Sequence, residues 1–448
     1  MSDPRQAVHF ADLGLNEPLC EALAELAYSV PTPVQVEAIP AVLAGRDLMA
    51  AAQTGTGKTG GFALPLLHRL SGDPIQVQPN SVKVLVLVPT RELAEQVHAS
   101  FQAYGRYLVL RTYAAYGGVS INPQMMALRK GVDVLVATPG RLLDLHRQNA
   151  VKLGQVQTLV LDEADRMLDL GFSRELDAVF AALPKRLQTL LFSATFSEAI
   201  RTMAAALLVQ PLSVEVSRPN STVGKIRQWL VPVDKKKKAA LFCHLLKNRR
   251  WGQVLVFVKT RKGAEQLVAL LQDKRIAADA IHGDKAQASR QRALDCFKAG
   301  EVQVLVATDV AARGLDIEAL PQVVNFDLPI VAEDYIHRIG RTGRAGAEGE
   351  AISLVCADEV TQLVAIENLI GQLIAREEEP GFEPAHRVPQ TQLAVGAIKK
   401  PKKPKAAKVG DKGTPGNWVG FDSGPAPDRR RGSGARPGGR KKSSPAGR

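Results

Sequence analysis

The strongest chemical signal in this chain is a lysine and several threonines set among glycines. Residues 52–59 read AQTGTGKT and lie between an apolar run and a segment that can open a helix. A glycine-rich turn before a helix directs backbone N–H groups and the positive end of the helix dipole at one point, which favours bound phosphate. In such loops the lysine contacts the outer phosphates and the next hydroxyl binds Mg²⁺. The stretch therefore predicts a nucleotide site built on Lys58 and Thr59, although Ala52 replaces the usual first glycine.

Polar residues also follow four short apolar runs, residues 84–88, 134–137, 158–161 and 189–192. The groups that follow them, in the same order, are Thr90 and Arg91, Thr138 and Arg141, Asp162 and Glu163, and Ser193 and Thr195. Short β-rich runs that alternate with amphipathic helical stretches are typical of a parallel sheet covered on both faces. Ligands bind beyond the carboxyl ends of such strands. These strand ends therefore predict one site, whereas strands that serve stability alone would end in simple turns.

The strand pattern repeats within the chain. Residues 84–90 read VLVLVPT and residues 254–260 read VLVFVKT, while VLVAT occurs at both 134–138 and 304–308. The offset is 170 residues in both cases, which predicts two copies of one α/β domain. The alternative is coincidence, because short valine-rich strands resemble one another. Only the first copy contains a glycine-rich loop with lysine and threonine, so only the first is expected to hold phosphates.

The second copy has polar groups of its own at its strand ends. They include Thr260, Arg290, Thr308 and the segment HRIGRTGR at residues 337–344. Arg341 and Arg344 are three residues apart, so on a helical turn they project in the same direction. Planar guanidinium groups can donate paired hydrogen bonds to phosphate oxygens and offset developing negative charge. A surface basic cluster or an ion pair is the alternative interpretation.

The net charge of +13 lies in the last 64 residues, which contain 16 Lys and Arg against three Asp. This stretch is rich in glycine and proline and poor in apolar residues, so it cannot bury enough surface to fold alone. Electrostatic attachment to nucleic acid is the expected role, since each neutralised phosphate releases counterions. A solubilising tail without a partner is the alternative. Trp418 and Phe421 interrupt the basic run and could stack on bases or dock on a protein.

Composition excludes several other classes. No apolar run approaches the ~20 residues that cross a bilayer, and the first residues lack the apolar core of a signal peptide. The four cysteines are far apart and form no metal-type pair, so we expect reduced packing residues in a cytoplasmic protein with no membrane contact.

Taken in order, these segments resemble a known family. They are Gln35, AQTGTGKT, PTREL, TPGR, DEAD (residues 162–165), SAT, ARGLD (residues 312–316) and HRIGRTGR. The series resembles the DEAD-box RNA helicases of superfamily 2 over about residues 10–370, and two minimal lobes with a basic tail resemble the bacterial RhlE-like subgroup. One departure is Ala27, where the family usually has glycine.

The resemblance implies two tandem RecA-like domains, each a parallel sheet with helices on both faces. The expected boundaries are residues 1–212 for the first domain, 213–224 for a linker, 225–380 for the second domain and 381–448 for a disordered basic tail that binds RNA. Across the closed domains the chain would bind ATP with Mg²⁺, and RNA of largely any sequence, single-stranded or duplex.

By position in the motifs, the resemblance also implies roles for single residues at the ATP site. Phe10 would stack on adenine and Gln35 would read its edge, a match to the donor and acceptor of an amide. The phosphates would rest on Gln53, Thr54, Gly55, Thr56, Gly57, Lys58 and Thr59. Thr59 and Asp162 would hold Mg²⁺, while Glu163 would position or deprotonate the attacking water. Ser193 and Thr195 would couple hydrolysis to closure, Asp316 would contact the ribose, Arg341 and Arg344 would act as arginine fingers, and His337 would bridge the lobes.

RNA would run over both lobes, on Thr90, Arg91, Gly118, Thr138 and Arg141 in the first and on Thr260, Arg290 and Thr308 in the second. Hydroxyls, backbone amides and arginines suit contacts to phosphate and sugar, which carry no base identity. The implied activity is RNA-stimulated ATP hydrolysis coupled to local, non-processive strand separation, with ribosomal precursors or RNA-degradation proteins as partners of the tail. A DNA translocase and a non-catalytic RNA clamp remain as alternatives, of which the clamp would not need Glu163 and the arginines. A metabolic kinase lacks support, because the second copy repeats the first.

Overall fold

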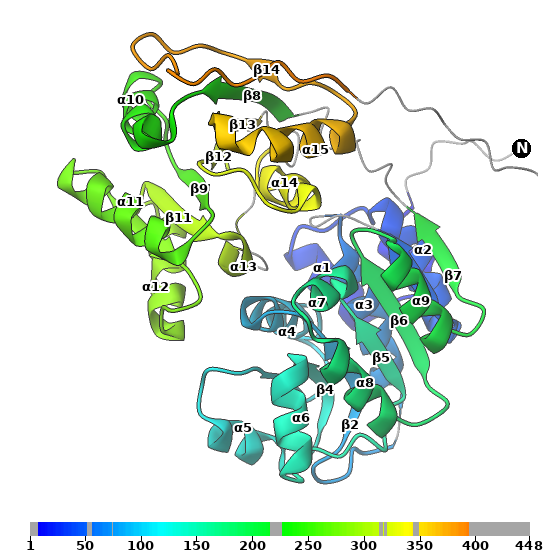
Figure 1. Cartoon of the computed structure of the whole chain (residues 1–448). Helices are drawn as coiled ribbons and strands as arrows, with labels where there is room; N and C mark the ends of the chain where they lie inside the picture. Colours follow the sequence, from blue (N-terminus) through cyan, green and yellow to red (C-terminus); the bar gives the residue numbers. More distant parts are fainter. Residues whose placement is uncertain are drawn as a thin grey trace, which may run out of the picture. The chain divides into compact units, whose positions relative to one another are not determined.

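The computed structural model describes residues 8–51, 56–73, 75–215, 226–312, 317, 320–343 and 349–393. These residues build two α/β lobes, lobe 1 (residues 8–215) and lobe 2 (residues 226–393), each centred on a seven-stranded sheet (Figure 1). All strand pairs between named strands are parallel in both sheets. The predicted fold class is therefore confirmed.

Lobe 1 alternates strands with helices after an N-terminal helical segment. Its strands are β1 (Leu48–Ala51), β2 (Val82–Leu87), β3 (Thr112–Ala115), β4 (Val132–Ala137), β5 (Thr158–Leu161), β6 (Gln188–Ser193) and β7 (Leu212–Glu215). Its helices are η1 (Phe10–Leu13), α1 (Glu17–Glu25), α2 (Pro33–Leu43), α3 (Lys58–Ser71), α4 (Arg91–Tyr104), α5 (Ile121–Leu128), α6 (Pro139–Arg147), α7 (Ala164–Asp169), α8 (Ser173–Ala182) and α9 (Glu198–Leu207).

Lobe 2 repeats this alternation. Its strands are β8 (Ile226–Pro232), β9 (Val254–Val258), β10 (Ala278–Ile281), β11 (Val304–Thr308), β12 (Gln322–Asn325), β13 (Gly349–Val355) and β14 (Ala375–Arg376). Its helices are η3 (Lys235–Lys237), α10 (Lys238–Asn248), α11 (Arg261–Asp273), α12 (Gln287–Lys298), α13 (Asp309–Ala312), α14 (Ala332–Ile339), η4 (Ala357–Glu359) and α15 (Val360–Ile370).

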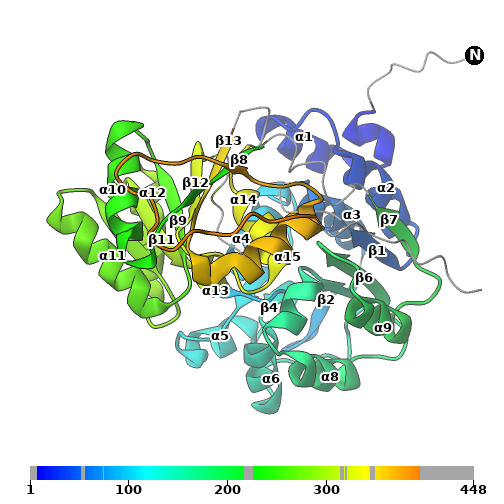
Figure 2. The same ribbon diagram turned by 45° about the horizontal axis from the view of Figure 1, so that its top comes forward.

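Burial on both faces explains why the central strands are continuously apolar. Side chains alternate across a strand, so Val84 and Val86 of β2 pack into one core while Leu85 and Leu87 pack into a second core on the opposite face. The first core takes residues from helices α1–α4 and the second from α5–α9. Figure 2 shows α2 and α3 on one side of this sheet and α8 and α9 on the other.

The two sheets have the same topology, which confirms the internal repeat. Their strand orders are β3-β4-β2-β5-β6-β1-β7 and β10-β11-β9-β12-β13-β8-β14, so each strand of lobe 1 has a counterpart at the same place in lobe 2. The repeated sequence runs coincide with counterparts, β2 with β9 and β4 with β11.

The sheet order brings three predicted segments to one edge of lobe 1. Strand β6 lies between β1, which precedes the glycine-rich loop, and β5, which precedes Asp162. In the parallel register Ala51 is paired with Ser193, and Leu161 with Leu191. The glycine-rich loop and the segments that begin at Asp162 and Ser193 therefore leave the same end of adjacent strands.

Two predicted boundaries differ from the observed elements. Residues 213–215, expected in the linker, belong to β7 and pair with β1. Residues 381–393, expected in the tail, continue with β14 as a C-terminal strap (residues 375–393) on lobe 2. In this strap Arg376 donates hydrogen bonds to the carbonyls of Val388 (2.9 Å) and Pro389 (2.7 Å), and Asp234 accepts one from the Ala385 amide (3.0 Å). Val388 is buried in a lobe 2 core, so the strap is part of the folded lobe.

Candidate active site and nucleic-acid interface

The glycine-rich loop enters α3 through Gly57, whose φ of 88° lies in the left-handed region that favours glycine. An added Cβ on Gly57 would lie 2.7 Å from Nε2 of Gln35 and 2.7 Å from Oγ1 of Thr32. Nε2 of Gln35 in turn donates a hydrogen bond to the Gly57 carbonyl (3.0 Å). The glycine thus allows α2 to contact the loop closely. Gln53, Thr54 and Gly55 lie outside the described residues.

Lys58 presents a buried cation at this loop. Its side chain is almost fully buried, and within the described part of the chain its Nζ has no hydrogen-bond partner. A buried ammonium without an acceptor is costly unless a ligand supplies one. Lys58 is the first residue of α3, where backbone N–H groups are also left without helical partners. The arrangement fits a polyphosphate.

Asp162 provides the opposite charge at the end of β5. Its carboxylate is 3% exposed, and burial raises its pKa to about 6, a shift that Glu163 increases and Lys58 opposes. An electrostatic effect of Lys58 on this carboxylate means that the cation and the anion lie near each other. Asp162 also accepts a hydrogen bond from the Glu163 amide through Oδ1 (2.9 Å).

Glu163 adopts a backbone conformation that is rare for its type. With φ 51° and ψ 52° it is left-handed, directly before the first residue of α7. Such conformations cost energy and cluster at functional sites in proteins. The two adjacent acidic residues differ in burial, since Asp162 is 3% exposed and Glu163 is half-buried.

Asp165 connects the acidic segment to the residues after β6. Its Oδ2 accepts hydrogen bonds from the amides of Ala194 (3.0 Å) and Thr195 (3.0 Å) and from the Thr195 hydroxyl (3.2 Å). The Ser193 hydroxyl donates to the Thr195 carbonyl (2.7 Å). Sequence reasoning assigned Ser193 and Thr195 to coupling but gave Asp165 no role, although it is the last residue of the DEAD segment.

The donor set fits a magnesium ion that completes its coordination with phosphate. No cluster of three or more His, Cys, Asp or Glu that could hold a metal occurs among the described residues. Mg²⁺ prefers oxygen ligands, keeps several waters and is commonly held by one or two carboxylates together with substrate phosphates. The Asp162 carboxylate, with the Thr59 hydroxyl next to the buried Lys58, matches that pattern.

The predicted adenine contacts are both packed into lobe 1. Phe10 is 6% exposed and belongs to a hydrophobic core with Leu13. Both ends of the Gln35 amide are engaged, since Oε1 accepts from the Thr32 amide (2.9 Å) while Nε2 contacts Gly57. Their roles in adenine recognition stay predictions.

Four predicted RNA-contact threonines occupy equivalent places in the two lobes. Thr90 and Thr138 follow β2 and β4, and Thr260 and Thr308 follow or end the counterparts β9 and β11. Each stands immediately before a helix, and the hydroxyls of Thr90 and Thr260 accept hydrogen bonds from N-terminal amides of α4 and α11 (3.3 and 3.0 Å). Helix N-termini at strand ends are favourable places for phosphate.

Two arginines accompany the threonines of lobe 1. The Arg91 guanidinium lies against Gly118, where an added Cβ would be 1.9 Å from Nη1. Arg141 donates through Nη2 to the Val119 carbonyl (2.8 Å), whereas its Nε and Nη1 are buried without an acceptor among the described residues. An acceptor such as a phosphate oxygen would satisfy these donors.

In lobe 2, Arg290 is 9% exposed and its Nη2 lies 2.7 Å from Glu92. Arg341 is also buried, one turn after His337, whose Nδ1 lies 4.0 Å from Oδ1 of Asp334. Asp316 and Arg344 lie outside the described residues.

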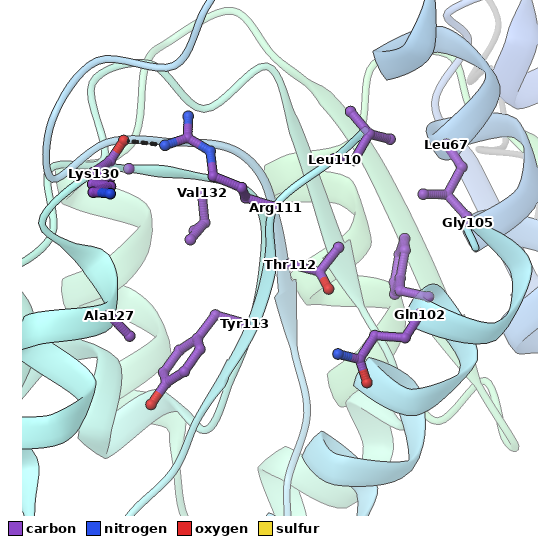
Figure 3. A pocket seen from close by; sticks show the side chains of 12 residues that line it. Leu67, Gln102, Gly105, Leu110, Arg111, Thr112, Tyr113, Ala127, Lys130 and Val132 are labelled. Carbon is purple, nitrogen blue, oxygen red and sulfur yellow. Dashed lines mark hydrogen bonds between the residues drawn. The ribbon is translucent and has the colours of Figure 1, made fainter. Parts of the chain in front are cut away.

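A cavity of about 400 Å³ lies elsewhere in lobe 1 (Figure 3). Gln102 of α4, Arg111, Tyr113 of β3 and Lys130 line it, with Arg111 donating to the Lys130 carbonyl (2.6 Å). It lies beside the amino ends of β3 and β4 and is lined by none of the predicted site residues. In the part of the chain that the structure describes, no helix is both long and apolar enough to cross a bilayer.

Comparison with known proteins agrees with this geometry. Residues 32–203 match the DEAD/DEAH box helicase family, and residues 237–346 match the helicase conserved C-terminal domain. The chain is 40% identical to the DEAD-box ATP-dependent RNA helicase CshA of Bacillus cereus. The match spans 385 residues, which are 86% of this chain and 72% of CshA. It is 40% identical over 371 residues to the DEAD-box ATP-dependent RNA helicase RhpA of Helicobacter pylori, covering 83% of this chain and 74% of that relative.

Two solved structures extend the comparison. S. cerevisiae Dbp5 bound to RNA and ADP BeF3 has a TM-score of 0.74 at 32% identity, over 83% of this chain and 95% of Dbp5. Mss116p bound to ssRNA and AMP-PNP has a TM-score of 0.75 at 29% identity, over 85% of this chain and 81% of Mss116p. The chain belongs to the family of DEAD-box ATP-dependent RNA helicases.

Proposed function

We propose that this protein hydrolyses ATP in response to RNA and uses the cycle to separate short duplexes locally, without processive movement. The observation that carries the proposal is the buried pair of Lys58, whose ammonium has no acceptor among the described residues, and Asp162, whose pKa is raised to about 6. Lys58 stands where the glycine-rich loop meets α3, and Asp162 stands at the end of β5, so the site suits a polyphosphate and its cation. The Dbp5 and Mss116p structures, each bound to RNA and a nucleotide or its analogue, support RNA as the second ligand.

In the hydrolysis step each residue of lobe 1 has a separate task. Lys58 binds the outer phosphates, and Thr59 and Asp162 would hold Mg²⁺, which when bound would neutralise phosphate charge. Glu163, which has a left-handed backbone, orients the attacking water and accepts its proton. Arg341 and Arg344 of lobe 2 offset the charge that develops on the transferred phosphate.

RNA binds along the strand ends through the four threonines and through Arg91, Arg141 and Arg290. These groups contact phosphate and sugar and so accept many sequences, while discrimination against DNA depends on the 2′-hydroxyl. Because the threonines occur as equivalent pairs in both lobes, one strand that contacts all four fixes the two lobes relative to each other. That is how RNA binding accelerates hydrolysis.

The basic residues after position 393 add a sequence-independent contact to RNA. Deleting residues 394–448 should weaken RNA binding most at low salt and make the slope of log affinity against log salt shallower. An unchanged slope would show that the tail does not touch RNA. Within the family we place the chain nearest the bacterial RhlE-like subgroup, with ribosomal precursors or RNA-degradation proteins as partners of the tail. We also propose a cytoplasmic location, which suits four unpaired cysteines.

The function is tested by ATP hydrolysis with RNA or DNA of one sequence. We expect RNA to stimulate turnover at least tenfold more than DNA, and Glu163→Gln to abolish turnover while ATP and RNA binding stay within about threefold. Glu21→Gln, at an exposed position of α1, is the matched control and should behave as the unaltered protein. Equal stimulation by DNA would favour a DNA translocase, and full turnover in Glu163→Gln would remove the assigned base.

A further inference from the structure

A buried cation in lobe 2 has no place in the hydrolytic or RNA-binding sets described above. Arg338 lies on α14, one residue after His337, and its side chain is 2% exposed. Taking a guanidinium out of water is costly unless its N–H groups all find acceptors. We therefore expect the N–H groups of the Arg338 guanidinium to have defined acceptors.

The side chain makes four hydrogen bonds at two strand ends, those of β11 and β12. Nε and Nη2 bind the two carboxylate oxygens of Asp309 (2.6 and 2.7 Å), while Nη1 donates to Oδ1 of Asn325 (3.0 Å) and to the Asp327 carbonyl (2.6 Å). The guanidinium carbon lies 4.9 Å from the centre of the Phe257 ring. We call Arg338, Asp309, Asn325, Asp327 and Phe257 the Arg338 hub. A bidentate carboxylate with further acceptors in one plane matches the fork of arginine and no other side chain.

Two members of the hub are connected to the predicted RNA-contact threonines of lobe 2, one along the chain and one through a hydrogen bond. Asp309 directly follows Thr308 and begins α13. The Asp327 carboxylate accepts a hydrogen bond through Oδ2 from the amide of Lys259 (2.9 Å), which directly precedes Thr260. Thr308 therefore adjoins a residue that Arg338 binds, and Thr260 adjoins a residue that is hydrogen-bonded to Asp327.

The other side of the hub is α14 itself, the helix that leads into the arginines assigned to the phosphate. Arg338 precedes Arg341 by three residues, and the Arg341 amide donates to the Arg338 carbonyl (3.2 Å). The buried Asn325 side chain also donates to the Ser353 hydroxyl (3.2 Å), so the hub is connected to the interior of the sheet. One side chain thus links the strand ends next to Thr260 and Thr308 to the helix that leads into Arg341.

We propose that Arg338 is a positioning residue that couples RNA binding at Thr260 and Thr308 to the placement of Arg341 against ATP. The inference rests on the proposed RNA-stimulated hydrolysis. Arg338 touches neither ligand, so its loss should leave each binding event nearly intact and reduce the effect of one ligand on the other. Lysine keeps the positive charge but offers one ammonium in place of a planar fork, and it cannot hold both Asp309 oxygens together with Asn325 and Asp327.

The experiment uses the full chain with three variants, Arg338→Lys, Asp309→Asn and Arg227→Lys. Arg227 is the matched control, because it also contacts two carboxylates of lobe 2 (Glu350 at 2.9 Å and Glu377 at 2.8 Å) but is 62% exposed. For each variant, RNA affinity is measured with and without a non-hydrolysable ATP analogue. RNA-stimulated ATP turnover is also measured, and the melting temperature reports whether the variant folds.

We expect the analogue to tighten RNA binding at least tenfold less in Arg338→Lys than in the unaltered protein, while RNA affinity without nucleotide stays within about twofold. RNA stimulation of ATP turnover should fall by a similar factor. Asp309→Asn should also reduce the tightening by the analogue without changing RNA affinity in its absence, but to a smaller degree. Arg227→Lys should change neither quantity. Asp309→Asn is nearly isosteric, so it keeps the test open if Arg338→Lys fails to fold.

Two results would overturn the coupling role. One is unchanged tightening in both hub variants, and the other is an equal loss of RNA affinity with and without the analogue, as a purely structural residue would give. If instead the unaltered protein showed no RNA-stimulated turnover, the proposed function itself would fail. That outcome is distinct, because it appears before any variant is examined.

Discussion

At the scale of single residues, the nucleotide site concentrates features that a protein built for stability alone would avoid. A buried carboxylate stands at the end of β5, a non-glycine residue follows it in the left-handed region, and a lysine ammonium is buried without an acceptor among the described residues. Each costs free energy in the empty protein. A bound nucleotide with its cation would recover that energy, so stability and ligand binding should be linked at this site.

The pKa of Asp162 gives the first prediction. Because the folded-state pKa is raised from the ordinary 3.8 to about 6, the folded protein carries an unfavourable buried charge above pH 6. The penalty, roughly 3 kcal/mol from the size of the shift, should fall away as the pH drops from 6 towards 4. Asp162→Asn should therefore raise the melting temperature in chelator at pH 8 and change it little at pH 4.5. An equal effect at both pH values would contradict this.

Gly57 gives the second prediction. Both Gly57 (φ 88°) and Gly45 (φ 73°) are left-handed, but an added Cβ meets Gln35 and Thr32 at Gly57 and nothing within 4 Å at Gly45. Replacement by alanine should cost about 1–2 kcal/mol of backbone strain at either position. Only Gly57→Ala should also weaken ATP binding, by tenfold or more, because it displaces Gln35 from the loop. Equal ATP affinity in the two variants would mean that this close approach is unimportant.

At the scale of elements, the strap at the end of lobe 2 extends the folded part of the chain past the boundary suggested by composition. Arg376 holds the carbonyls of Val388 and Pro389, and Val388 is buried in a core that also contains Tyr335 of α14. The strap therefore supports the helix that carries Arg338 and leads into Arg341.

Two truncations distinguish the contribution of the strap to stability from that of the tail. Ending the chain after Leu393 should leave the melting temperature unchanged, whereas ending it after Pro380 should lower it, because burial of Val388 alone contributes about 2 kcal/mol. Circular dichroism on the two truncated chains checks this. If both melted at the temperature of the full chain, the strap would contribute no stability to the lobe.

The elements also show what the sequence could predict. The continuous apolar runs at β2, β4, β5, β6, β9 and β11 were predicted, because a strand buried on both faces needs apolar side chains throughout. Edge strands such as β3 and β7 are shorter and partly exposed, so their composition gives no comparable signal. The strap has a two-residue strand and depends on hydrogen bonds to distant carbonyls, which no local pattern reports.

Site residues divide in the same way. Lys58, Asp162 and Glu163 could be predicted from the chemistry of one short segment each. Asp165 and Arg338 lie within segments that were recognised, yet their partners are 29 residues away in both cases, at Ala194 and Asp309. Only the folded sheet brings those partners within hydrogen-bond distance, so their roles depend on tertiary structure.

At the scale of the whole molecule, two lobes of one topology have diverged in chemistry. Lobe 1 holds the glycine-rich loop and the carboxylates, while lobe 2 has its own pair of threonines predicted to contact RNA and adds the arginines and the Arg338 hub. The central claim is that neither half hydrolyses ATP efficiently alone, because the groups that act on the phosphate are divided between them.

The most direct test compares ATP turnover by residues 1–216 and by the full chain, each with saturating RNA. The fragment contains both cores of lobe 1 and the complete glycine-rich loop, and its fold is checked by circular dichroism and ATP binding. Without the arginines of lobe 2 we predict turnover that is slower by about 10³-fold or more, since that is the usual contribution of an arginine finger. Turnover by the fragment at the rate of the RNA-bound full chain would contradict the account.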